Sequence, residues 1–335
     1  MKPSRLPAFL FVLLALSCDK RPSDAQLEAW KREADDKNDA AAQAHAAKSS
    51  AGKWSITFSG RIKDRSVRLD WARLQELATT HVKTRAPHHS VNPKQVIDWR
   101  GIEVRKLLDL LGATDDAQTL TFLGDDLFSA TISVRDAKRW PIILAVEQDG
   151  APIKRSEAGP VVLVFPYTEM PEVEKTYDET YWAFYVSHVV VDRDAPRIRV
   201  GQRVLDRAAL EKLPRTMIEG KVGFRVHWPA ERVKVYGPRL RDVLAEAGVA
   251  IQDGAKYAVR SKAPALPEDT HEVRVDAADV KGCDVILAMA WGEDKVEIPA
   301  PMGGPIGLAF GPECRDKYAK MPWTMYAEDI EVIAP

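Results

Sequence analysis

The stretch Leu69-Asp70-Trp71-Ala72-Arg73-Leu74-Gln75-Glu76-Leu77 recurs in the second half of the chain as Leu205-Asp206-Arg207-Ala208-Ala209-Leu210-Glu211-Lys212-Leu213. The same spacing aligns, without a gap, the residues Gly101, Leu107, Leu108 and Gly112 with Gly237, Val243, Leu244 and Gly248. Farther on, Gly159-Pro160 and Trp182 match Gly304-Pro305 and Trp323 in the same order. A period of about 140 residues predicts two tandem domains rather than a solenoid.

Each copy has a pattern typical of a mixed α and β structure. Trp54, Ile56 and Phe58 alternate with small polar residues, which favours a strand. Asp70 is placed to cap a short helix. Val104, Leu107, Leu108 and Leu111 lie on one face of a helix that we expect to end at Gly112. The continuous apolar run 161–165 predicts a strand buried on both faces.

The composition argues against a nucleic-acid binder and is that of an ordinary globular protein. The 335 residues include 48 Lys and Arg against 49 Asp and Glu, for a formal net charge of -1. This balance argues against a dedicated nucleic-acid binder, which would carry a basic excess. Hydrophobic residues make up 45% and charged residues 29% of the chain, as in an ordinary globular protein.

The N-terminus has the features of an export signal. Lys2 and Arg5 precede an apolar run, 6–16, that is too short to span a bilayer. The run ends in Leu14-Ala15-Leu16-Ser17-Cys18, which resembles a bacterial lipobox with two positions exchanged. We expect a lipoprotein signal peptide at residues 1–17 and acylation of Cys18; ordinary cleavage beside an incidental cysteine is the alternative. The protein would then be lipid-anchored in the bacterial cell envelope, facing the periplasm or the outside.

Residues 18–53 are predicted to form a tether that is partly helical. The segment is rich in Ala, Asp and Lys, and it ends in Ser49-Ser50-Ala51-Gly52. It would act as a spacer from a membrane, or alternatively as a helix that binds a partner. The two domains would follow at 54–194 and 195–335, with the joint near the charged, proline-containing stretch 192–196.

The order of these segments resembles the molybdopterin-binding domain of the sulfite oxidase family. The pieces that carry the resemblance are Trp99-Arg100-Gly101-Ile102, Leu107-Leu108, Asp149-Gly150-Ala151-Pro152 and the run from Ala158 to Pro166. The resemblance covers about residues 54–191 and, more weakly, 197–334. It implies an α+β fold, here in two tandem copies with layered mixed β-sheet, and it makes molybdopterin a candidate cofactor.

The resemblance also identifies a loop where this chain departs from the family. In catalytic members, a cysteine in the loop before the Trp-x-Gly motif gives a thiolate to molybdenum. The matching loop here, 84–94, contains Arg85, His88 and His89 and no cysteine, and the loop 224–229 of the second copy has none either. The resemblance leaves pterin binding open without that ligand, because the phosphate and pterin contacts come from other groups. We expect Arg85, His88, His89 and Gly159 to contribute to a cofactor site.

Three groups of residues have two interpretations each. His88-His89 could bind a metal, haem or an anion, or the pair could belong to a solvated loop, because adjacent side chains on an extended segment point to opposite sides. Cys283 and Cys314 would form a disulfide in an exported protein, or remain unpaired. Gly159-Pro160 and Gly304-Pro305 could let a backbone approach a ligand, or they could start a buried strand.

Three functions follow from these expectations. The first is non-catalytic binding of a small-molecule ligand or a protein partner, because the molybdenum-ligating cysteine is absent. The second is a molybdopterin-dependent oxidoreductase with an altered metal ligand. The third is an interaction module that binds an envelope redox protein.

Overall fold

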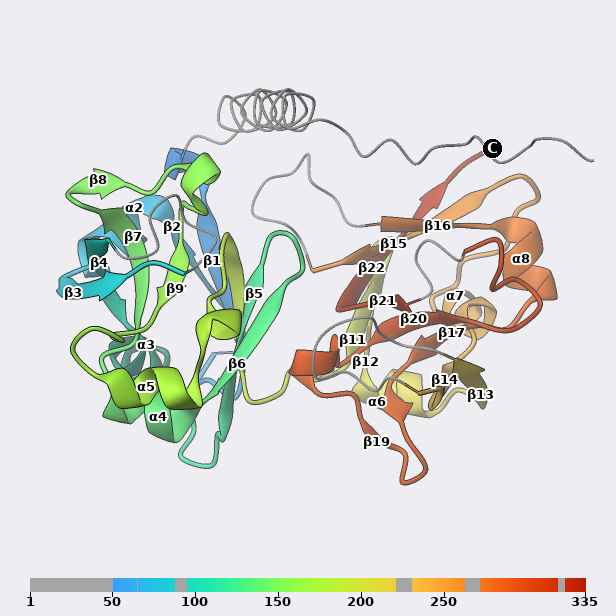
Figure 1. Ribbon diagram of the computed structural model, residues 1–335. Coiled ribbons are helices and arrows are strands. Elements are labelled where there is room, and N and C mark those ends of the chain that lie inside the picture. The colour runs from blue at the N-terminus through green and yellow to red at the C-terminus, as the bar shows by residue number, and fades with distance from the viewer. Residues whose placement is uncertain (1–50, 65, 88–94, 221–230, 263–271, 319–322) are drawn as a thin grey trace, which may run out of the picture.

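The computed structural model describes residues 51–335, except for 65, 88–94, 221–230, 263–271 and 319–322 (Figure 1). The predicted signal peptide, Cys18, most of the tether and the pair His88-His89 lie outside the described residues. The described chain forms two halves that lie side by side, with residues before the joint at the left of Figure 1 and those after it at the right. No helix of the described residues is both long and apolar enough to cross a membrane.

The first half contains two sheets and several short helices. Its elements are η1 (Ala51–Lys53), β1 (Ser55–Gly60), β2 (Ser66–Asp70), α2 (Trp71–Leu77), β3 (Thr80–Arg85), β4 (Val96–Glu103), α3 (Val104–Leu111), β5 (Thr119–Gly124), β6 (Ser129–Ser133), α4 (Val134–Arg139), β7 (Ile143–Gln148), β8 (Ala151–Pro152), η2 (Arg155–Glu157), β9 (Val162–Val164), α5 (Pro171–Thr176), η3 (Glu179–Tyr181) and β10 (Val186–Val191). One sheet has the order β2-β1-β10-β5-β6, and the other has the order β3-β4-β7-β8 with β9 beside β7. In the first sheet, β1 and β10 are parallel and the other pairs are antiparallel.

The second half repeats this order of strands in its larger sheet. Its elements are β11 (Arg197–Val200), β12 (Arg203–Asp206), α6 (Arg207–Glu211), β13 (Arg215–Gly220), β14 (Val233–Pro238), α7 (Leu240–Glu246), β15 (Lys256–Ser261), β16 (Glu272–Asp276), α8 (Ala277–Gly282), β17 (Val285–Ala288), β18 (Ala290–Trp291), β19 (Val296–Glu297), η4 (Ala300–Met302), β20 (Gly307–Phe310), β21 (Trp323–Thr324) and β22 (Ala327–Ile333). The sheet β12-β11-β22-β15-β16 again has one parallel pair, β11 with β22. The remaining strands form β13-β14-β18-β19 and β17-β20-β21.

Local sequence explains the matching helices. The carboxylate of Asp70 accepts a hydrogen bond from the backbone N–H of Arg73 and so caps α2, as the sequence predicts. Asp206 caps α6 in the same way, through the backbone N–H of Ala209. The helix α3 ends at Gly112, whose φ of 60° lies in the left-handed region that glycine tolerates.

Close backbone packing explains two of the matched glycines. A Cβ on Gly101 would lie 2.3 Å from the carbonyl oxygen of Leu144, and one on Gly237 would lie 1.8 Å from that of Leu287. Each glycine therefore lets two strands approach at the same place in its half.

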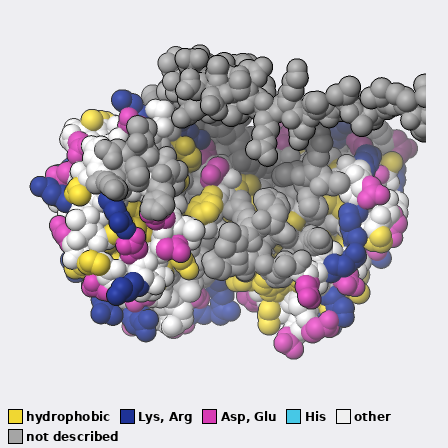
Figure 2. All heavy atoms as spheres, viewed as in Figure 1, with side chains coloured by type: hydrophobic (Ala, Val, Ile, Leu, Met, Phe, Trp, Pro, Cys, Tyr) yellow, Lys and Arg dark blue, Asp and Glu magenta, His cyan; other side chains and the backbone are white. Residues whose placement is uncertain are grey.

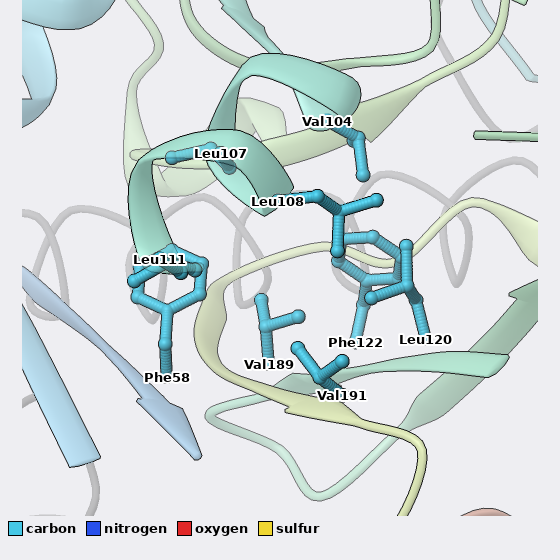
Figure 3. Close-up of a pocket in the computed structure, with 9 residues that line it drawn as sticks. All are labelled: Phe58, Val104, Leu107, Leu108, Leu111, Leu120, Phe122, Val189 and Val191. Atoms are coloured by element: carbon cyan, nitrogen blue, oxygen red, sulfur yellow. The ribbon is translucent and has the colours of Figure 1, made fainter. Parts of the chain in front are cut away.

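The core of the first half lies between α3 and the larger sheet (Figure 3). Val104, Leu107, Leu108 and Leu111 point from α3 toward Phe58 and apolar residues of β5 and β10. The space left among these side chains is about 10 Å³, and its lining is apolar. A gap of this size in an apolar core has no groups that would hold a water or a ligand.

The two halves contact each other through an apolar cluster and a buried ion pair. Leu123 and Leu127 of the first half belong to one cluster with residues of the second half, including Met325 and Tyr326. The Nζ of Lys262 lies 3.2 Å from Asp194, in the joint between the halves. Elsewhere on the face shown in Figure 2, basic and acidic side chains are interspersed over both halves.

Candidate ligand-binding site

Arg85 ends β3, directly before the loop that the sequence marks as a site. Its backbone N–H donates to Thr168 Oγ1 at 3.2 Å, and its guanidinium forms an ion pair with Glu174 of α5. The Nε of Arg85 is buried and has no hydrogen-bond partner within the described structure. One N–H donor thus remains available to an acceptor from outside these elements.

His88 and His89 follow in a segment outside the described residues. The predicted metal site at these histidines therefore remains a prediction. Within the described ranges, the one group of three His, Cys, Asp or Glu side chains close enough to hold a metal lies in the second half, at Asp279, Cys283 and Cys314.

Aromatic rings pack behind the end of β3. Trp99 of β4 meets Trp182 edge-on, with ring centroids 5.9 Å apart, and Tyr167 lies 6.0 Å from Trp182. The indole nitrogen of Trp99 is buried and, like Arg85 Nε, lacks a partner among the described residues. A buried indole N–H usually finds an acceptor, so this is a second available donor.

Two tyrosines of this cluster have structural partners. The hydroxyl of Tyr167 donates to the backbone oxygen of Tyr177 at 2.7 Å, and the hydroxyl of Tyr177 donates to Asp136 Oδ2 at 2.7 Å. Burial raises the pKa of both phenols, so they stay protonated near neutral pH. Their arrangement supports the rings and supplies no base.

Gly159 lies in a separate part of the half, between η2 and β9. A Cβ at this position would lie 2.1 Å from the backbone oxygen of Ile153, and the same holds for Gly304 against Ile298 at 1.8 Å. A close approach within the protein therefore explains each glycine. The contacts of Arg85 lead to Thr168 and α5, whereas those of Gly159 lead to the β8–β9 connection, so the two predicted site residues have different neighbours.

Arg155, whose side chain is only 13% exposed, was not identified from the sequence. Its guanidinium carbon lies 4.1 Å from the ring centroid of Tyr185 and 5.3 Å from that of Trp54. Its Nη2 pairs with Asp125 at 3.3 Å, and its Nη1 is buried without a partner in the described structure. The sequence gives little indication of this role, because the stacking partner Trp54 lies far away in the chain. The one local indication is that Arg155 lies shortly before Gly159-Pro160.

A second hollow lies at the junction of the halves. It measures about 670 Å³ and is lined by residues of the joint and of the β19–η4 loop: Thr119, Asp192, Arg193, Asp194, Lys295, Val296, Glu297, Ile298, Pro299, Ala300, Pro301 and Pro305. Its carboxylates already have cationic partners. Asp192 pairs with Arg61 at 3.2 Å, Asp194 with Lys262 at 3.2 Å, and Glu297 with Arg207 at 2.7 Å. Because these carboxylates are already neutralised by ion pairs, the hollow is poorly suited to select a charged ligand.

The residues at the end of β3 fit part of a molybdopterin group. Arg85 Nε and Trp99 Nε1 are buried N–H donors, which suit the acceptor-rich phosphate and pterin portions. Arg155 Nη1 is a further buried donor, in the separate part of the half that holds Gly159. Molybdenum also needs a soft ligand in the family's manner, and the sequence has no cysteine between residues 18 and 283. The donor set therefore fits an anionic organic ligand and does not fit thiolate ligation of molybdenum.

The search of curated proteins finds no match. Thirty chains of solved structures match. One is described as the crystal structure of the sulfane dehydrogenase SoxCD from Paracoccus pantotrophus. It is 10% identical, with a TM-score of 0.33, and the alignment covers 72% of this chain and 62% of that chain. A likeness at this TM-score carries no argument about fold or function.

The comparison with protein families concerns the first half. Residues 43–170 match the model described as the oxidoreductase molybdopterin binding domain. The match includes the site loop, Trp99 and the Gly-Pro step. Residues 43–170 are therefore similar to the molybdopterin-binding, oxidoreductase-like domain family.

Proposed function

We propose that this chain is a lipid-anchored protein of the bacterial cell envelope whose first domain binds an anionic, acceptor-rich small molecule without molybdenum catalysis. The observation that carries the proposal is a contrast within one domain. The domain matches the molybdopterin-binding family, yet its site loop has no cysteine. Two buried donors that have no partner among the described residues, Arg85 Nε and Trp99 Nε1, support retained ligand binding.

We also propose that the second half is a divergent tandem copy of the first. The recurrence of the 69–77 stretch at 205–213 supports this, as does the shared strand order of the two larger sheets. A lipid anchor at Cys18 would hold both copies at a membrane. Replacing Cys18 with Ser should move the protein from the membrane fraction to the soluble fraction, and an unchanged distribution would contradict the anchor.

The test of the ligand is metal and pterin analysis of the protein purified from its native envelope. Mass spectrometry would quantify molybdenum, and oxidised extracts would be examined for pterin fluorescence. We expect no stoichiometric molybdenum. Stoichiometric molybdenum with pterin would overturn the proposal in favour of an oxidoreductase with an altered metal ligand.

Binding measurements then test the named donors. Calorimetric titration with a pterin phosphate should give weaker binding for Arg85→Gln by about tenfold, because a charge-assisted hydrogen bond is lost. Arg73→Gln is the matched control, since Arg73 forms only an exposed ion pair with Glu76 on α2. Equal affinities of the two variants would place the ligand elsewhere.

A further inference from the structure

A cluster of metal-binding side chains lies at the end of α8, away from the candidate ligand site. Cys283 directly follows α8, and Cys314 lies in the turn after β20. The two form a disulfide, with their Cα atoms 6.2 Å apart. A carboxylate oxygen of Asp279 lies within 4.8 Å of both sulfur atoms.

We propose that, when this disulfide is reduced, Cys283, Cys314 and Asp279 bind one zinc ion. Two thiolates and a carboxylate are ligands that zinc accepts, and a fourth position would be filled by water. Zinc–sulfur distances near 2.3 Å require the sulfur atoms to separate to about 3.8 Å in a tetrahedral site. Side-chain rotation at the two cysteines can supply this separation, because Cys283 lies just after its helix rather than within it.

The surroundings of Asp279 are arranged to orient a ligand. The hydroxyl of Tyr318 donates to Asp279 Oδ2 at 2.6 Å, and Lys317 Nζ donates to the same oxygen at 2.5 Å. Hydrogen bonds to one carboxylate oxygen fix the group while the other oxygen can bind a metal.

A cation lies beside the proposed site. Zinc with two thiolates and one carboxylate carries a formal charge of -1, and the ammonium of Lys317, which also pairs with Asp276 at 2.6 Å, contacts Asp279.

Reduction must precede zinc binding, because the disulfide offers no thiolate. A dithiol, from a protein reductant or dithiothreitol, gives two electrons and two protons to the disulfide and becomes a disulfide itself. Zinc binding then displaces the two thiol protons. Cys314 is 4% exposed, whereas Cys283 and Asp279 are only partly buried, so reductant and metal would enter at Cys283.

The first half provides a natural comparison, because it has the same short helix and the same tyrosine–aspartate hydrogen bond but no cysteine at this place. Trp140 follows α4 where Cys283 follows α8, and Tyr177 bonds Asp136 as Tyr318 bonds Asp279. A carboxylate and a phenol in this arrangement therefore do not by themselves make the site. The two cysteines distinguish the second half.

The test uses the full-length protein in detergent, reduced under anaerobic conditions. Cobalt, as a spectroscopic stand-in for zinc, should bind at one ion per chain and give thiolate-to-metal absorption, and zinc should displace it. The oxidised protein should give no such absorption. Absence of the absorption in the reduced protein would overturn the proposal.

Variants and a protection assay sharpen the test. Asp279→Asn should weaken zinc binding at least about tenfold, whereas Asp253→Asn, which removes an exposed partner of Lys281, should not. Unchanged affinity in the Asp279 variant would overturn the three-ligand site. Zinc should also slow alkylation of Cys283 in the reduced wild-type protein, a readout that does not depend on a variant folding. Equal alkylation rates with and without zinc would likewise contradict the site.

Discussion

The two halves stabilise the same structural position with different chemistry. In the first half, Trp140 packs edge-on against Tyr177 with ring centroids 6.0 Å apart. In the second half, the position after the matching helix is Cys283, which is joined to Cys314. Both halves keep a stacked Phe–Tyr pair, Phe165 with Tyr177 and Phe310 with Tyr318. The two halves thus share the Phe–Tyr pair and the tyrosine–aspartate hydrogen bond, and they differ in the contact made by the residue after the helix.

The two halves also differ in the buried charge that they carry at a matching place: a carboxylate in the first half and an ammonium in the second. The backbone N–H groups of Asp125 and Lys262 donate to the carbonyl oxygens of Tyr185 and Tyr326 at 3.0 and 2.9 Å, so the two residues hold matching places. The side chain of Asp125 is fully buried and pairs with Arg155 within its own half. Lys262 pairs with Asp194 in the joint and with Glu328. The buried carboxylate of Asp125 therefore pairs with a cation of its own half, whereas the buried ammonium of Lys262 also pairs with the joint.

The largest expected effects come from removing the disulfide of the second half or the Trp140–Tyr177 contact of the first half. Replacing both Cys283 and Cys314 with Ser should lower the free energy of unfolding of the second half by about 4 kcal/mol, because the cross-link encloses about 30 residues. Thermal unfolding followed by calorimetry should show the second half melting earlier and the first unchanged. Trp140→Ala should lower the free energy of unfolding of the first half by about 3 kcal/mol and leave the second half unchanged. A uniform shift of both halves in either variant would mean that they unfold as one unit.

Removal of the buried cation in the joint should have the next largest effect. Lys262→Met leaves the carboxylates of Asp194 and Glu328 without their cation, and we expect a loss of about 3 kcal/mol. Denaturant unfolding measures this loss, with Lys281→Met as an exposed control. A loss no greater than that of the control would show that the joint does not depend on this charge.

Acid sensitivity should follow from His188. Burial lowers the pKa of His188 to about 3, and the positive charge of Lys262 adds to this effect. Below pH 6.5 the unfolded chain binds the proton more readily than the folded chain does, so stability falls as the pH decreases toward 3. At pH 5 the expected loss relative to neutral pH is about 2 kcal/mol.

The variant His188→Gln should lose this dependence of stability on pH. The control variant His81→Gln, at an exposed position, should keep it. Lys262→Met should raise the pKa of His188 by removing a nearby positive charge, which NMR titration would detect. A His188 that titrates near 6.5 in the wild-type protein would contradict this account.

The smallest effect tests whether the halves are equivalent at their matching helix caps. Asp70→Ala and Asp206→Ala each remove one hydrogen bond to a backbone N–H group, at 2.9 and 3.0 Å. Each should cost about 1 kcal/mol in its own half. Unequal losses, measured by calorimetry, would show that one helix is held by packing rather than by its cap.

Local patterns predicted much of the fold, because they depend on neighbouring residues. The apolar face and the glycine end of α3 are confirmed, and so is the Asp70 cap of α2. The Tyr177–Asp136 and Tyr318–Asp279 bonds were not predicted, because the segments before these tyrosines differ in sequence and each bond joins residues far apart in the chain.

The candidate site was harder to predict than the fold. Arg85 stood out because it flanks the loop that departs from the family, whereas Arg155 depends on stacking against the distant Trp54. Gly159 had two interpretations, and only the approach of Ile153 distinguishes a packing requirement from a ligand contact. Unpartnered donors such as Trp99 Nε1 cannot be read from a sequence, since a missing acceptor is a property of packing.

The parallel pairing of the first and last strands of each half has a mechanical consequence. The chain enters the first half at one end of the β1–β10 pair and leaves from the opposite end, with Gly60 beside Val191. Tension between the ends of the half therefore loads the backbone hydrogen bonds of this pair in shear, all at once, instead of peeling them apart singly. The pair β11–β22 gives the second half the same geometry. A protein pulled from both ends would resist at these two central strand pairs before its helices or outer hairpins carried the load.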